Sequence, residues 1–225
     1  MTTAVIMAGG DGRRLHPLTL KTPKPMLKVN GRPMLEWVLK RFVTQDITDI
    51  FISVRYLGEQ IESYFGDGVN FGARIKYLRE NDPLGTAGAL GLLPAMAEPF
   101  IVINGDILTS VNFGDMLRYH ETNGAVATVG AAVHSVEVPF GVLNAPDCVL
   151  ASVEEKPVFS YPISAGVNVF SPEVLRHLRI MGATSMPEFL ENLIAHGKKI
   201  MVFPISGGCL DIGTHENYGA ANGAV

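Results

Sequence analysis

The sequence predicts an α/β fold, a three-layer sandwich in which helices cover both faces of a predominantly parallel but mixed sheet. Over the first hundred residues, apolar runs of strand length alternate with segments of helical periodicity, which is typical of parallel strands joined by helices. Over the second half, strand-like segments follow one another with little helix between them, which favours antiparallel pairs. A chain of 225 residues, 47% of them hydrophobic, is long enough for one domain with a sizeable core.

The first half of the chain contains four expected strands and three expected helices. The clearest helix follows Pro33, because Leu35, Val38, Leu39 and Phe42 recur on one helical face. We expect the strands at 4–7, 49–54, 73–78 and 100–103, and the other two helices at 57–65 and 85–93.

The second half is richer in strands. We expect a helix to begin at Ser185, which stands three residues before Glu188 in the spacing of a capping box. The buried face of that helix is expected to consist of Phe189, Leu190, Leu193 and Ile194. The other elements expected here are strands at 125–133, 140–144, 149–154, 163–170 and 200–203, and helices at 171–180 and from about 214.

A glycine-rich, cationic loop follows the first strand. Gly9, Gly10 and Gly12 let backbone N–H groups turn toward an anion, and Arg13, Arg14 and Lys24 follow closely. The loop is not a dinucleotide fingerprint, because Leu15 stands where the third glycine belongs, and it lacks the Gly-Lys-Ser/Thr ending of a P-loop. Because ligands of open parallel sheets bind at the carboxyl ends of the strands, the loop predicts a site for nucleotide phosphates.

Two aspartates follow apolar runs elsewhere in the chain, Asp106 after the strand at 100–103 and Asp211 in Leu-Asp-Ile-Gly. Magnesium prefers oxygen ligands and usually takes one or two carboxylates together with substrate phosphates. Each aspartate alone is equally typical of a turn or a helix cap. The sequence around each aspartate does not show whether Asp106 and Asp211 lie close together in space.

Composition excludes several classes of protein. The net charge of −4 and the pI near 5.9 argue against a nucleic-acid-binding protein, which would carry a basic field. The two cysteines, Cys148 and Cys209, form neither a disulfide framework nor a metal-ligand cluster, so a reducing cytoplasm is expected. The chain shows no signal peptide and no run near the ~20 apolar residues that span a bilayer, so no membrane association is expected.

The loop and six later blocks resemble, in order, the motifs of the sugar-phosphate nucleotidyltransferases. The resemblance covers essentially residues 4–220 and implies a Rossmann-like fold with an antiparallel sugar-binding portion. It divides the single domain, 1–225, into a nucleotide-binding half, about 1–110, and a sugar-phosphate-binding half, about 111–225, without a carboxyl-terminal left-handed β-helix. The blocks are 9–19 with 23–26, 83–88, 104–106, 140–142, 154–157, 165–167 and 210–213.

The resemblance also implies roles for particular residues. The family's catalytic positions match Arg14 on the leaving pyrophosphate, Lys24 at the α-phosphate, and Asp106 and Asp211, which would hold Mg²⁺. Positions that bind the nucleotide match Ala8, Gly9, Gly10, Gly12, Arg13, Gly85 and Thr86. Positions that bind the sugar phosphate match Gly141, Glu155, Lys156, Ser164 and Gly166.

The reaction implied is transfer of a nucleoside monophosphate from a nucleoside triphosphate to a sugar 1-phosphate by direct in-line attack, with release of pyrophosphate. The block 83–88 resembles the mannose-1-phosphate guanylyltransferase branch, so GTP is favoured, while thymidylyl, uridylyl and cytidylyl transfer stay open. Ser164, Asn168 and Cys209 depart from the family's pattern on the sugar side, which leaves the acceptor open. A non-catalytic regulatory subunit that binds nucleotide sugars is the alternative from another class, and association into a homo-oligomer also stays open.

Overall fold

The computed structural model describes residues 2–223 and is built around a seven-stranded sheet in the order β12-β8-β11-β6-β1-β4-β5. The four strands from the first half pair in parallel, whereas β11 runs antiparallel to both β6 and β8. The expected mixed, predominantly parallel sheet is therefore confirmed. Its strands are β1 (Thr3–Met7), β4 (Asp49–Val54), β5 (Arg74–Arg79), β6 (Phe100–Asn104), β8 (Ala127–Glu137), β11 (Val158–Phe170) and β12 (Ile200–Pro204).

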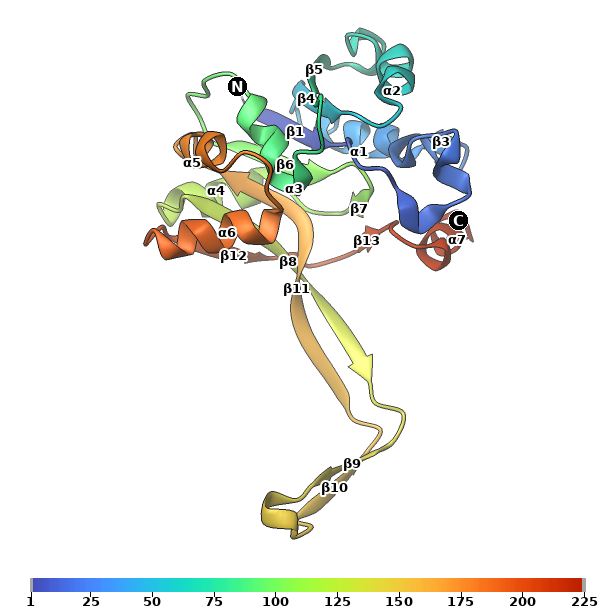
Figure 1. The fold of residues 1–225 in the computed structure, drawn as a ribbon, viewed down its shortest axis with the longest axis vertical. Helices are drawn as coiled ribbons and strands as arrows, with labels where there is room; N and C mark the ends of the chain where they lie inside the picture. Colours follow the sequence, from blue (N-terminus) through green and yellow to red (C-terminus); the bar gives the residue numbers. More distant parts are fainter. Residues whose placement is uncertain (1, 224–225) are drawn as a thin grey trace.

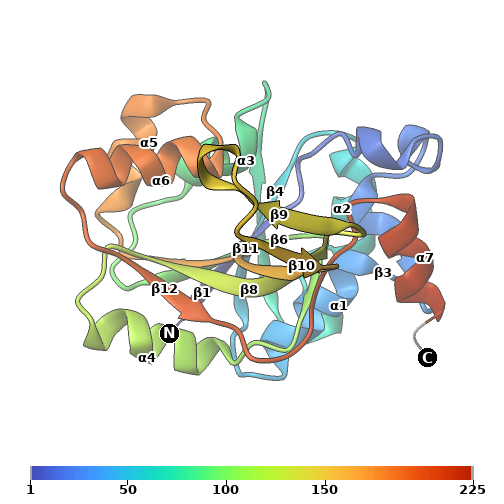
Figure 2. The same cartoon turned by 90° about the horizontal axis from the view of Figure 1, so that it is seen from below.

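Helices cover both faces of this sheet and make the three layers (Figure 2). On one face lie α1 (Met34–Val43), α2 (Gly58–Phe65) and α4 (Phe113–Thr122), and their apolar side chains share one core cluster. On the other face lie α3 (Gly85–Gly88), α5 (Val174–Met181) and α6 (Met186–Ala195), which share a second cluster. Within residues 2–223, none of the helices combines the length and the apolar character needed to cross a membrane.

Three two-stranded sheets lie outside the central one. The strands β2 (Lys28–Val29) and β3 (Arg32–Pro33) form a small hairpin, against which α7 (His215–Gly223) packs through a third core cluster. The strands β7 (Ile107–Thr109) and β13 (Cys209–Asp211) pair antiparallel although they are a hundred residues apart in the chain. The third pair is β9 (Gly141–Asn144) with β10 (Ser152–Glu155).

Two helices differ from the expectation. The capping box of α6 is present, since the Ser185 N–H donates to the Glu188 carboxylate at 2.8 Å and the Ser185 hydroxyl accepts from the Glu188 N–H. The expectation that Ile194 is buried is wrong: it is 62% exposed, because Phe189 and Leu193, with the partly buried Leu190, fill the contact with the core. The helix expected at 85–93 ends at Gly88 and tightens into a 3₁₀ turn at Ala89–Leu92.

The outer halves of β8 and β11 leave the body of the molecule as a two-stranded ribbon, which we define as residues 131–164. The pairing continues without interruption from Ala131 with Ser164 to Glu137 with Val158, and the hairpin β9–β10 forms the far end. Figure 1 shows this ribbon projecting well beyond the sheet and its helices. The sequence predicted shorter strands here because an alternating pattern does not say where a strand leaves the sheet.

Candidate active site

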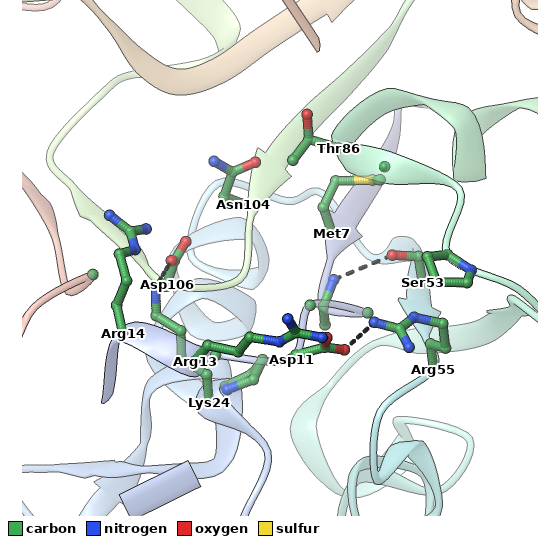
Figure 3. A pocket seen from close by; sticks show the side chains of 18 of the residues that line it. Met7, Asp11, Arg13, Arg14, Lys24, Ser53, Arg55, Thr86, Asn104 and Asp106 are labelled. Atoms are coloured by element: carbon green, nitrogen blue, oxygen red, sulfur yellow. Dashed lines mark hydrogen bonds and ion pairs between the residues drawn. The ribbon is translucent and has the colours of Figure 1, made fainter. Parts of the chain in front are cut away.

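A cavity of about 480 Å³ opens at the carboxyl edge of the parallel strands (Figure 3). Its lining contains every residue that the sequence predicted for catalysis or nucleotide binding: Ala8, Gly9, Gly10, Gly12, Arg13, Arg14, Lys24, Gly85, Thr86, Asp106 and Asp211. Nine further residues line the cavity. Five of them lie in the sequence motifs without a predicted role, Asp11, Pro25, Pro83, Asn104 and Gly213, and four lie outside the motifs, Met7, Ser53, Arg55 and Glu80. A volume of this size suits a nucleotide or a comparable small molecule.

The glycine loop is held in place by short-range contacts. The Ala8 N–H donates to the Ser53 carbonyl at 3.1 Å, which ties the start of the loop to the end of β4. Gly12 has a φ of +64°, a conformation that favours glycine, and the Thr19 hydroxyl donates to its carbonyl at 2.9 Å. At Gly9, a Cβ atom would collide with the Glu80 carboxylate, so the glycine lets the end of that side chain lie directly against the loop.

Asp11 gathers two guanidinium groups on one side of the loop. It forms ion pairs with Arg55 and with Arg13, the latter at 3.2 Å, and the hydrogen bond from Arg55 holds the pKa of Asp11 below its usual range. Arg55 follows β4 at the same edge as the loop, and this position after a parallel strand is the signal by which the sequence could have indicated it. Arg13 keeps 81% of its side chain exposed, at the rim of the cavity.

Lys24 lies between the two aspartates that the sequence left apart. Its side chain is only 11% exposed, its ammonium forms an ion pair with Asp106, and Asp211 lies 4.0 Å away. The antiparallel pairing of β13 with β7 sets Asp211 opposite Ile107 and therefore beside Asp106. Burial, and then the neighbouring Asp106 carboxylate, raise the pKa of Asp211.

The Asp106 and Asp211 carboxylates are a candidate site for a cation, because both lie close enough to interact with the cationic Lys24 ammonium. Within residues 2–223 no group of three or more His, Cys, Asp or Glu side chains gathers as a metal cluster. A divalent cation at Asp106 and Asp211 would thus need further oxygen ligands from phosphate or water. That is the ligand set typical of magnesium in nucleotide sites.

The opposite end of the cavity is formed by Glu80 and the segment that enters α3. Burial raises the pKa of Glu80, whose carboxylate accepts a hydrogen bond from the Leu84 N–H at 3.2 Å. Gly85 has a φ of +77°, and a Cβ atom there would collide with the Thr184 carbonyl. The Thr86 hydroxyl accepts from the Met186 N–H at 2.7 Å, so α6 buttresses this wall.

The residues predicted for the sugar phosphate lie outside the cavity lining. Gly141, Glu155 and Lys156 lie at the far end of the ribbon, and Ser164 is exposed at its base. Gly166 comes nearer, because a Cβ atom there would lie 2.9 Å from the Asn104 Nδ2, which lines the cavity. Cys209 is half-buried, and its thiol donates to the Ala165 carbonyl at 3.5 Å.

Comparison with known proteins points to one family. The sequence profile of the nucleotidyl transferase family matches residues 3–225. The mannose-1-phosphate guanylyltransferase catalytic subunit beta of Drosophila pseudoobscura pseudoobscura is 31% identical over 227 residues, which cover 96% of this chain and 60% of that protein. This chain spans about three fifths of the length of the curated relatives it matches.

Solved structures agree with this match. A structure described as a glucose-1-phosphate thymidylyltransferase from Bacillus anthracis, in complex with a sucrose, has a TM-score of 0.81 at 27% identity, covering 100% of this chain and 95% of that one. HddC from Yersinia pseudotuberculosis complexed with GMP-PN has a TM-score of 0.75 at 25% identity, covering 100% of this chain and 99% of that one. The fold of this chain is therefore shared with both solved structures over nearly the whole of each.

Proposed function

This chain belongs to the nucleotidyl transferase family, and from that premise we propose that it transfers a guanylyl group from GTP to a sugar 1-phosphate. The observation that carries the proposal is the Lys24 ammonium, buried between Asp106 and Asp211 at the mouth of a glycine loop. A buried cation, two carboxylates and backbone turned toward an anion are what phosphoryl chemistry by positioning and charge stabilisation requires.

In the proposed reaction, an oxygen of the sugar 1-phosphate attacks the α-phosphorus of the triphosphate in line. The bond from the α-phosphorus to the bridging oxygen breaks as the new P–O bond forms, and that oxygen leaves with the pyrophosphate. Lys24 contacts the non-bridging α-phosphate oxygens, where charge develops, and Arg14 holds the leaving pyrophosphate. No covalent intermediate with the enzyme is needed, so catalysis rests on alignment and electrostatics.

Asp106 and Asp211 would hold the divalent metal that this family generally needs, and we propose Mg²⁺. When bound, the metal neutralises phosphate charge. The Asp211 carboxylate, whose pKa burial and Asp106 raise in the absence of a cation, becomes more stable as an anion beside one. Arg14 lies against the same strand end, since a Cβ atom on Gly213 would lie 3.0 Å from its Nη2 and 2.8 Å from the Asp211 Oδ1.

We assign the preference for guanine to Glu80. Guanine presents two donors on its Watson–Crick edge, N1–H and the N2 amino group, whereas thymine and uracil present one donor between two carbonyl acceptors. A half-buried carboxylate in the base end of the cavity pairs with the two donors and repels the carbonyls. The guanylyltransferase relative and the GMP-PN complex of HddC agree with this choice.

We place the activity in the cytoplasm, where nucleoside triphosphates are abundant. Cys148 is exposed and Cys209 is half-buried, and both are free thiols, which fits a reducing compartment.

The test is a matrix of nucleoside triphosphates against sugar 1-phosphates with Mg²⁺, read by release of pyrophosphate. We expect turnover with GTP and a hexose, hexosamine or heptose 1-phosphate. Preference for TTP, UTP or CTP would contradict the role of Glu80 but not the reaction. A blank matrix would contradict the reaction and favour a nucleotide-sugar-binding regulatory subunit.

A further inference from the structure

The ribbon of residues 131–164 has one apolar face that none of the residues 2–223 covers. Directly opposed residues of an antiparallel pair point to the same face, and the register pairs His134 with Tyr161 and Val136 with Phe159. Ala132, opposite Ile163, packs against the core of the sheet, so this face continues the buried face of the sheet outward. We call it the apolar face; Tyr161 is 54% and Ile163 45% exposed on it.

The opposite face of the ribbon is mixed. There Ser135 and Ser160 join their hydroxyls at 2.9 Å, Glu137 lies opposite Val158, and Val133 lies opposite Pro162. Val133 and Val158 are themselves 75% and 61% exposed. A two-stranded ribbon is marginally stable in water unless a hydrophobic face is covered. Of the 19 large hydrophobic side chains that are exposed on the described residues, 11 lie between Val133 and Ile163. Covering these side chains with another protein surface would therefore stabilise the ribbon.

The far end of the ribbon carries two residues that the proposed function needs at the active-site cavity. Glu155 and Lys156, predicted to bind the sugar phosphate, lie beyond seven uninterrupted pairs, Ala131–Ser164 to Glu137–Val158. At about 3.3 Å per residue, that ladder extends roughly 20 Å from the body before the hairpin begins. Lys156 therefore lies far from the cavity of its own chain, while the cavity lacks a group from the ribbon.

The rim of the cavity has a surface that complements the far end of the ribbon. Residues 12–28 carry four exposed Lys or Arg side chains beside the buried Lys24, and no carboxylate. Leu18 and Leu20 are 41% and 56% exposed among them. The ribbon between residues 133 and 163 carries four carboxylates against the single lysine, with exposed Phe140, Leu143 and Val153. The surface of residues 12–28 is basic and apolar, and the ribbon is acidic and apolar, so the two surfaces are complementary in charge and both offer apolar contacts.

We propose that two copies of this chain exchange their ribbons, so that each ribbon docks on residues 12–28 of the partner and brings Glu155 and Lys156 to the partner's cavity. The inference rests on the proposed function for the role of Lys156, but not for the docking. A reciprocal exchange makes a closed two-fold dimer in which the same two surfaces are used twice. Each active site is then composed of two chains.

A mixing experiment tests the shared site. Lys24→Ala removes the cavity lysine and keeps the ribbon, whereas Lys156→Ala does the reverse, and each variant alone should have little activity. Random reassortment of the two should recover about a quarter of the wild-type activity, because half of the dimers contain one complete site. Failure to exceed the sum of the separate activities, or full activity of Lys156→Ala alone, overturns the proposal.

A cross-linking experiment tests the docking without any need for activity. The single exposed thiol on the ribbon, Cys148, takes a benzophenone maleimide in a Cys209→Ser background. Irradiation of a mixture of ¹⁴N- and ¹⁵N-labelled chains should give cross-links between the two labels, from the hairpin to residues 12–28. Cross-links within one label only, or none, overturn the exchange, and this result holds even if no substrate pair is turned over.

Paired surface variants test which face of the ribbon is covered. Val136→Ser with Phe159→Ser changes the apolar face, and Val133→Ser with Val158→Ser makes matched changes on the opposite face. Sedimentation equilibrium should show the first pair shifted toward monomer by at least about tenfold in dissociation constant, and the second pair little changed. Equal effects, or a monomeric wild type, contradict the assignment of the apolar face.

Discussion

Asp211 lies beside Asp106 because β13 pairs with β7, although the two residues are far apart in the chain. The pairing sets Asp211 opposite Ile107, and the Ile212 N–H donates to the Asp106 carbonyl at 3.0 Å. The Lys24 ammonium contacts both carboxylates. This short ladder is the feature that turns two separate turn-like aspartates into one candidate metal and phosphate site.

Replacing Lys24 by Ala should lower kcat by about 10²–10³-fold, because the lost charge acts on the transition state. The KM for GTP should change much less, and circular dichroism should match the wild type. Steady-state pyrophosphate release measures the change. Lys76→Ala, an exposed lysine on the edge strand β5 that does not line the cavity, is the control and should keep its activity. A Lys24→Ala enzyme within about threefold of wild type would contradict the role.

Replacing Asp106 or Asp211 by Asn should raise the Mg²⁺ concentration needed for half-maximal activity, since a neutral amide is a poorer ligand than a carboxylate. A loss of about tenfold or more in metal affinity is expected from either change. Magnesium titrations of the rate measure it, with Asp115→Asn on the exposed surface of α4 as the matched control. An unaltered metal requirement in both site variants would remove the metal from these residues.

Replacing Glu80 by Gln should lower kcat/KM for GTP by about 10–100-fold, because a charged hydrogen-bond acceptor is lost from the base end of the cavity. The values for UTP and TTP should fall less or rise. Competition between GTP and UTP gives the ratio directly, and Glu59→Gln on the exposed side of α2 is the control. If all nucleotides lose equally, Glu80 acts on the fold of the cavity and not on base choice.

Replacing Gly85 by Ala should destabilise the protein by more than the ~1 kcal/mol that a positive φ alone imposes. The reason is that the new Cβ would collide with the Thr184 carbonyl, beyond the strain of a φ of +77°. Gly124→Ala isolates the strain, because its φ is +56° and nothing lies within 4 Å of the added atom. Urea unfolding compares the two variants, and equal losses would rule out the steric contribution at Gly85.

His120 should make folding pH-dependent. It is 1% exposed, between the Thr128 hydroxyl at 2.9 Å and the Ser171 hydroxyl at 3.0 Å, and burial lowers its pKa below 6.5. As the pH falls below about 6.5, the unfolded chain takes up a proton that the folded chain resists, so the free energy of unfolding decreases. Above about pH 6.5, both states hold the imidazole neutral and the effect vanishes.

Urea unfolding at about pH 7.5 and about pH 5.5 measures this dependence. His120→Gln should be less stable than wild type at both values but should lose less on acidification. His215→Gln, at the exposed start of α7, should keep the wild-type dependence. If His120→Gln loses as much stability as wild type on acidification, His120 is not the source.

The sequence by itself determined the strands of the central sheet and most of the helices that cover it, in their order, but not the short strands β2, β3, β7 and β13. Apolar runs such as 100–103 and helical faces such as Leu35 to Phe42 have local periodicities that follow directly from strand and helix geometry. The glycine loop was also readable, because Gly9, Gly10 and Gly12 stand next to Arg13 and Arg14 in the chain. Such a motif can be recognised without knowing which distant segment of the chain packs against it.

Tertiary structure alone decided which distant groups meet. Arg55 and Glu80 enter the cavity because β4 and β5 run parallel to β1, and their positions directly after these strands point to the cavity only once the strand order is known. The same holds for Asp211, which depends on the pairing of β13 with β7. For Glu155 and Lys156 the reverse holds. Their motif was recognisable in the sequence, but the long pairing of β8 with β11 places them far from the cavity. Strand register and sheet order are set by contacts between segments, whereas periodicity and motifs are set within them.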